Sequence, residues 1–291
     1  MNIDVYRIGA AALETLGMAA SGSVQGVTSR GAFLRIIDRI IYITPLDYRS
    51  PFNLTLAGGD QRFERLEPGD QFTISGSQIT FSTKNIRVFT EQAEVWQPPL
   101  PVAIHSPLNE QYTRAQAIAA RLRQFDAQRG YLFLSNPDEV SLEGESFRVI
   151  QAAKEVTASF TRGNRAGFLQ AAESLIGSGG GLTPSGDDFL AGFLLYHVRR
   201  VLATGIERDS LFDWIAEVSA IAFQRTTTIS ANRLLFTARG WSEDIFLNLI
   251  DHLFDPSVSF TDDQICLLMD IGHSSGVDTF MGMLYAIRSL S

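Results

Sequence analysis

Residues 177–192 read GSGGGLTPSGDDFLAG, and this stretch decides how the second half of the chain is interpreted. Four of the five residues at 177–181 are glycine, so the segment does not suit a regular element, and it lies between two stretches with helical spacing. Such a loop exposes backbone N–H groups, and a helix that follows it adds the free N–H groups of its first turn, which together attract phosphate or carboxylate. No Gly-Lys-Ser/Thr follows, so this is not a phosphate loop. The stretch predicts an anion site of a more general kind.

A second segment repeats the first at a constant offset of 90 residues. The repeated residues are Ser275, Gly276, Asp278, Gly282 and Leu284, which correspond to Ser185, Gly186, Asp188, Gly192 and Leu194. Glycine inside a helix is unfavourable unless the missing side chain lets another backbone approach closely. The repeat therefore predicts that two helices cross near Gly192 and Gly282 as a pseudo-two-fold pair, with both N-termini beside one pocket.

Both copies contain the pattern Ser-x-x-Asp, which allows two interpretations of the aspartates. In the first, the serine oxygen accepts from an N–H of the helix while Asp188 or Asp278 reaches back to the N–H of the serine, as in a capping box. In the second, the two carboxylates contact a ligand or a metal ion directly. The sequence leaves both interpretations open.

Two residues that the copies do not share are the candidates for catalysis. Asp187 corresponds to Val277 in the second copy. It could accept a proton or bind a divalent cation. Alternatively, it could only place a favourable negative charge in the first turn of a helix. His273 corresponds to Thr183, and it could be an acid, a base or an anion donor, or a histidine bonded to backbone. We take Asp187 and His273 as the predicted catalytic residues.

A third polar cluster, residues 225–233 (RTTTISANR), reads as a break between helices with Ser230 as a possible N-cap. The functional interpretation is that its hydroxyls and amide line the same pocket, with Arg225 or Arg233 holding a carboxylate or phosphate. Together the three segments give the predicted substrate-binding residues, which are Gly179, Gly180, Gly181, Thr183, Ser185, Gly186, Asp188, Thr227, Thr228, Ser230, Asn232, Ser275, Gly276 and Asp278.

The rest of the chain predicts an α+β protein with an N-terminal small β-barrel or sandwich (1–100) followed by a mainly helical domain (101–291). The first 20 residues read as a short helix or a loose lead-in. Seven short β-rich runs then follow, separated by turns such as 58–60 and 68–70, at 23–28, 32–36, 40–44, 53–56, 71–74, 78–81 and 86–89. Residues 97–101 (QPPLP) form a stiff linker. A short strand is expected at 132–134, and helices at 115–125, 147–159, 165–176, 187–203, 211–224, 231–238, 241–253, 262–269 and 277–289.

Composition narrows the functional classes. The formal net charge of -8 does not favour binding to nucleic acid or to an anionic membrane. Of the 24 basic residues, 22 are arginine, whose guanidinium group binds planar oxyanions. No apolar run reaches the length of a membrane span, and residues 1–20 lack the pattern of a secretory signal, so we expect a cytoplasmic protein. Cys266 lies in an apolar run and is expected to be buried.

Three motifs carry a resemblance to a known family: GGGLTPSGDDFLAG at 179–192, TTTISANRL at 226–234 and GHSSGVDTFMGML at 272–284. They resemble a bacterial family first catalogued as a domain of unknown function, one branch of which contains a subunit of oxamate carbamoyltransferase in anaerobic allantoin degradation, a route of purine catabolism. The resemblance implies a transferase subunit within a hetero-oligomer. The implied substrates are carbamoyl phosphate and oxamate, or phosphate and oxalurate in reverse.

A non-catalytic anion-binding or regulatory subunit is the alternative function. The motifs leave open the cofactors, any metal and whether the chain is itself catalytic.

Overall fold

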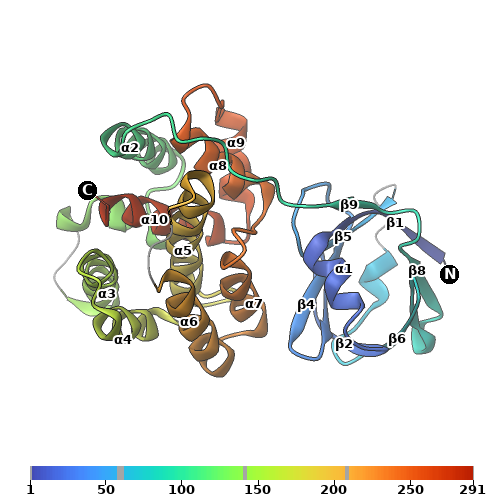
Figure 1. Ribbon diagram of the computed structural model, residues 1–291. Helices are drawn as coiled ribbons and strands as arrows, with labels where there is room; N and C mark the ends of the chain where they lie inside the picture. Colours follow the sequence, from blue (N-terminus) through green and yellow to red (C-terminus); the bar gives the residue numbers. More distant parts are fainter. Residues whose placement is uncertain (1, 58–61, 140–142, 207–209, 291) are drawn as a thin grey trace. The chain divides into compact units, whose positions relative to one another are not determined.

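A computed structural model describes residues 2–57, 62–139, 143–206 and 210–290 (Figure 1). The chain divides into two compact units, Met1–Pro99 and Leu100–Ser291. The first unit is built from strands and the second from helices, which confirms the predicted α+β fold class.

The first unit is a closed β-barrel, so of the two architectures predicted the barrel is confirmed. Within the described residues, eight strands form the ring in the order β5-β4-β3-β2-β6-β7-β8-β1, and antiparallel pairing of β1 with β5 closes it. A further strand, β9, pairs with β1. The strands are β1 (Asn2–Gly9), β2 (Ser21–Thr28), β3 (Gly31–Ile36), β4 (Arg39–Thr44), β5 (Asn53–Leu56), β6 (Gln71–Ser75), β7 (Gln78–Phe81), β8 (Ile86–Phe89) and β9 (Glu94–Trp96).

All seven predicted strands form, but the sequence missed β1 and β9. The expectation of a helix or loose lead-in at the N-terminus is correct only for α1 (Ala10–Leu16). Residues 2–9 instead extend, because Ile3, Val5 and Ile8 enter the barrel core while the backbone of this segment pairs with β5, β8 and β9. Short 3-10 helices η2 (Arg62–Arg65) and η3 (Ser82–Lys84) connect strands. The turn predicted at 58–60 lies outside the described residues.

Every predicted helix of the second unit forms. These are α2 (Leu108–Phe125), α3 (Gly144–Thr161), α4 (Arg165–Leu175), α5 (Ser185–Thr204), α6 (Leu211–Arg225), α7 (Thr228–Thr237), α8 (Asp244–Phe254), α9 (Asp262–Asp270) and α10 (Ser275–Arg288). The strand predicted at 132–134 is wrong, because these residues belong to the 3-10 helix η4 (Gly130–Ser135), with η5 (Pro137–Glu139) after it. Leu132 and Leu134 are buried there, so the apolar run reflects burial and not strand pairing.

Helices α5 and α10 pack together in the middle of the helical unit, with the other helices around them (Figure 1). Every residue from 186 to 199 and from 275 to 287 is buried, so both helices are enclosed on all sides by the rest of the unit. A Cβ on Gly192 would stand less than 3.0 Å from the carbonyl oxygen of Thr279, and one on Gly282 would stand as close to that of Phe189. The two contacts obey the 90-residue offset, so the predicted crossing at these glycines is confirmed.

The expected burial of Cys266 is wrong, because its side chain is exposed. Helix α9 is amphipathic, and it turns Ile265, Leu268 and Met269 inward while Cys266 and Leu267 lie on its outer face. None of the helices in the described parts of the chain combines the length and the hydrophobicity that crossing a bilayer requires.

Candidate functional site

The starts of α5 and α10 meet, joined by serine and threonine hydroxyls. Thr183 Oγ1 lies 2.7 Å from Ser275 Oγ, and Ser185 Oγ lies 3.5 Å from Ser274 Oγ. Residues about 90 positions apart in the chain therefore share one site, and the four hydroxyls belong to both copies of the repeat. The pocket predicted beside them stays a prediction.

The capping interpretation of Ser-x-x-Asp is wrong. The N-cap residues are Pro184 and Ser274, and neither cap makes a side-chain hydrogen bond. Ser185 and Ser275 are already the first helical residues, one position too late to serve as caps. The two aspartates are consequently free of that role and turn into the interface between the helices.

Asp188 is a buried carboxyl with one charged partner. Its side chain is 1% exposed, Oδ1 accepts from Arg233, and Oδ2 is buried without completing a hydrogen bond. Burial raises the pKa of Asp188 to about 8; Arg233 opposes this shift, the charge of Asp278 adds to it, and the nearby hydroxyls of Ser275 and Thr183 partly offset it. The direction of this shift favours the protonated form of the carboxyl.

Asp278 occupies the corresponding place on α10. It is fully buried, Oδ1 accepts from the backbone N–H of Tyr131 at 2.6 Å, and Oδ2 completes no hydrogen bond. Burial raises the pKa of Asp278, and the hydrogen bond from Tyr131 and the nearby hydroxyls of Ser185 and Ser274 oppose this shift. Asp188 thus lies near a serine of α10, and Asp278 near a serine of α5, so the two copies are linked reciprocally.

Asp187, a predicted catalytic residue, holds two donors of the protein. It is 1% exposed; Oδ1 accepts from the N–H of Gly177 at 2.8 Å, and Oδ2 accepts from the hydroxyl of Thr226. Burial raises its pKa, and these bonds, with the Ser230 hydroxyl, oppose the shift. Asp187 therefore connects Gly177, at the start of the glycine-rich stretch, to Thr226 of the third polar cluster. Its catalytic role stays a prediction.

Residues 177–183, here called the glycine segment, form the loop that precedes α5. Within the described residues, the N–H groups of 179–183 donate no backbone hydrogen bond, and 179–182 are exposed. The segment is anchored at its far end, where Leu182 accepts a bond of 2.7 Å from the Thr227 hydroxyl. The segment leads directly into α5, where the N–H of Gly186 donates back to the carbonyl of Ser178 at 3.0 Å.

The third cluster joins the site only in part. The prediction of Ser230 as N-cap is wrong, because Thr227 caps α7 by accepting from the Ser230 N–H at 3.1 Å. Thr228 and Asn232 bond to each other within α7, through Asn232 Nδ2 and the Thr228 carbonyl at 2.7 Å. Arg225 pairs with Glu173 at the surface, and Arg233 pairs with Asp188 and with Glu243 at 3.5 Å.

His273 lies in the exposed turn that leads into α10, next to Ser274. In the described parts of the chain, it makes no hydrogen bond or ion pair. Its predicted role in acid–base chemistry stays a prediction. Among the other histidines, His197 lies 3.1 Å from Ser289 Oγ inside the helical core.

Sequence reasoning missed Gly130 and Tyr131, which complete the site from η4. The Tyr131 hydroxyl lies 2.7 Å from Ser178 Oγ in the glycine segment, and its N–H binds Asp278. Neither residue belongs to the repeat or to a glycine-rich stretch. The one feature of the sequence that could have pointed to them is Gly130, which stands directly before the apolar run 131–134.

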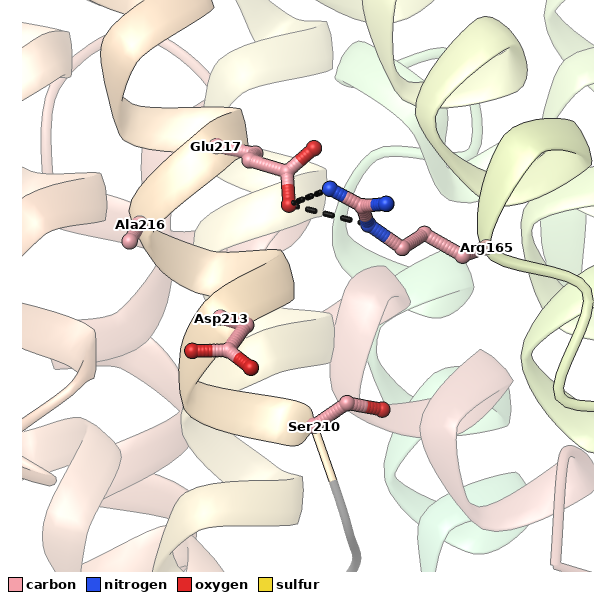
Figure 2. A pocket seen from close by; sticks show the side chains of 5 residues that line it. All are labelled: Arg165, Ser210, Asp213, Ala216 and Glu217. Atoms are coloured by element: carbon pink, nitrogen blue, oxygen red, sulfur yellow. Dashed lines mark hydrogen bonds and ion pairs between the residues drawn. The ribbon is translucent and has the colours of Figure 1, made fainter.

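A separate hollow of about 490 Å³ lies elsewhere in the helical unit (Figure 2). It is lined in part by Ser210, Asp213, Ala216 and Glu217 of the α6 region and by Arg165, whose Nε donates to Glu217 at 2.9 Å. Ser210, Asp213, Ala216 and Glu217 come after α5 in the chain, and Arg165 begins α4. None of these five lining residues belongs to the glycine segment or to the starts of α5 and α10. Among the described residues, no three His, Cys, Asp or Glu side chains gather as metal ligands would.

Fold and site together define a class of protein in which a β-barrel precedes a helical unit built around two related, facing helix starts. Residues 175–287 match the family model described as oxamate carbamoyltransferase subunit AllH, which confirms the resemblance seen in the sequence. The matched range contains both helix starts and residues 226–234. Comparison with curated proteins and with solved structures gives no match.

Proposed function

We propose that this chain is a subunit of an oxamate carbamoyltransferase assembly, and that its helical unit binds a small anion where α5 and α10 begin. The family match supports the assembly. The observation that carries the anion site is the 2.7 Å contact between Thr183 and Ser275, which brings two helix starts together beside the free N–H groups of 179–183.

The chemistry of the proposed reaction suits such a site. Carbamoyl phosphate and oxamate give oxalurate and phosphate, and both substrates are anions. The transfer requires donors that hold phosphate, stabilise a developing oxyanion and orient the two reactants, which backbone N–H groups and hydroxyls can provide without a covalent intermediate. Because the pKa of Asp188 is raised to about 8, this carboxyl adds little negative charge beside a bound anion at pH 7.

Binding is tested by adding one methyl group to the glycine segment. Gly181 has φ +90° with open space around its Cβ position, and Gly163, after α3, has φ +67° with equally open space. Gly181→Ala and Gly163→Ala therefore carry the same kind of backbone strain. We expect calorimetry with inorganic phosphate and oxamate to show affinity at least about tenfold weaker for Gly181→Ala and unchanged for Gly163→Ala. No heat with either ligand for the unaltered protein would contradict the anion site.

The proposed catalytic role of Asp187 is tested with Asp187→Asn. This change conserves both contacts, because Asn Oδ1 can still accept from Gly177 while the Thr226 hydroxyl can accept from the new amide. In the reconstituted assembly we expect turnover to fall by about 100-fold or more with ligand affinity retained. Unchanged turnover would remove Asp187 from the chemistry.

A non-catalytic anion-binding or regulatory subunit is the second candidate. It is favoured by the engagement of both Asp187 oxygens with protein donors and by the exposed position of His273. That function predicts full turnover with Asp187→Asn, and it predicts changed activity of the assembly with Gly181→Ala.

A further inference from the structure

The segment 129–131 lies outside both copies of the repeat and outside residues 175–287, which match the family model. It nevertheless contacts three elements at the site: α9, α10 and the glycine segment. Arg129 Nη2 donates to the carbonyl of Met269 at the end of α9, at 2.6 Å. The N–H of Tyr131 donates to Asp278 on α10 at 2.6 Å, and its hydroxyl lies 2.7 Å from Ser178 in the glycine segment. One short stretch of chain therefore holds three elements that follow it by about 50 to 150 residues.

The approach of this segment to α10 depends on Gly130. Its φ is +50°, in the left-handed region that favours glycine, and a Cβ there would stand less than 3.0 Å from Oδ1 of Asp278. A residue with a side chain would have to displace the carboxylate. The absence of a side chain at 130 thus lets the next N–H, that of Tyr131, reach Asp278.

The contact with Ser178 is transmitted to α5. The carbonyl of Ser178 accepts from the N–H of Gly186 at 3.0 Å, and the N–H of Ser178 donates to Leu175 at 2.9 Å. Tyr131 is therefore connected to the start of α10 by one bond and to the start of α5 through Ser178. Its ring is 7% exposed and packs near Phe189 of α5, which fixes its position.

We propose that Tyr131 is a positioning residue of the anion site. It fixes the glycine segment relative to the start of α10, so that donors at both helix starts face one ligand. The ligand in this inference rests on the proposed function, whereas the positioning of the segment does not. Burial raises the pKa of Tyr131 to about 12, so its hydroxyl keeps its proton throughout the physiological range.

The test compares Tyr131→Phe with Tyr285→Phe. Tyr285 is a matched control, because it is 2% exposed and its hydroxyl donates to the carbonyl of Leu134, also in η4, at 3.2 Å. Each variant loses one hydroxyl whose hydrogen bond involves η4, because Tyr131 belongs to η4 and Tyr285 donates to it. The two variants should therefore lower the melting temperature similarly. Two readouts separate positioning from stability: hydrogen exchange of the amides of Ser178 and Gly186, and the dissociation constants for inorganic phosphate and oxamate.

We expect Tyr131→Phe to speed exchange at Ser178 and Gly186 by about tenfold and to weaken ligand binding by about tenfold, with Tyr285→Phe unchanged in both. Ser178→Ala should reproduce Tyr131→Phe, and the double variant should add little to either. Unchanged exchange in Tyr131→Phe overturns the inference, even if the protein binds neither ligand. Faster exchange without ligand binding in the unaltered protein supports the positioning role while the proposed function fails.

Discussion

Gly192→Ala is expected to lower the free energy of unfolding of the helical unit by about 3 kcal/mol or more, with the same loss for Gly282→Ala. Each new Cβ would overlap a backbone carbonyl oxygen, of Thr279 or of Phe189, and backbone cannot rotate away as a flexible side chain can. The two central helices would have to separate along a buried interface. Alanine is otherwise better than glycine in a helix by about 0.5–1 kcal/mol, so the expected sign is the reverse of intrinsic propensity.

Gly180→Ala is the matched control, because Gly180 has open space at its Cβ position and no positive φ. We expect its free energy of unfolding to stay within about 0.5 kcal/mol of the unaltered protein. Urea denaturation followed by far-UV circular dichroism reports on the helical unit, which holds nearly all the α-helix. A loss below about 1 kcal/mol for both Gly192→Ala and Gly282→Ala would contradict the close crossing.

The crossing could be predicted from the sequence because its cause is repeated there. A glycine inside a helix lowers helix stability, and close packing against another backbone can compensate for this loss. Gly192 and Gly282 both lie inside helices and are separated by the 90 residues of the repeat. The helices themselves followed from apolar spacing. The chemistry at their starts did not, because a one-residue shift of the helix boundary moved Ser185 and Ser275 from cap positions to first helical residues.

Long-range contacts account for the other differences. Strand β1 closes the barrel by pairing with β5, about 50 residues away, and no local pattern encodes that partner. Tyr131 reaches Asp278 across 147 residues, and nothing in the short run around it marks a site. The sequence therefore predicts which segments carry the site more reliably than which atoms meet in it.

The stability of the helical unit should fall as pH rises from about 4 to about 8, through the ionisation of Asp188. Burial raises its pKa to about 8 in the folded protein, against the ordinary value of 3.8 for an aspartate. Between these values the unfolded chain has released the proton and the folded chain still binds it, so stabilisation is complete below about pH 4 and lost by about pH 8. One such group contributes a slope of up to about 1.4 kcal/mol per pH unit.

The contribution of Asp188 is isolated by subtracting the Asp188→Asn variant, which cannot ionise there. We expect the free energy of unfolding of the unaltered protein, relative to Asp188→Asn, to decline from about pH 4 and to level off above about pH 8. Asp262→Asn is the control: Asp262 is exposed and its Arg121 partner lowers its pKa, so any contribution it makes is already complete above about pH 4 and its difference curve should be flat. Parallel curves for the unaltered protein and Asp188→Asn would mean that Asp188 is ionised in the folded state. Asp188 would then carry a negative charge beside the helix starts, which would oppose the binding of an anion there.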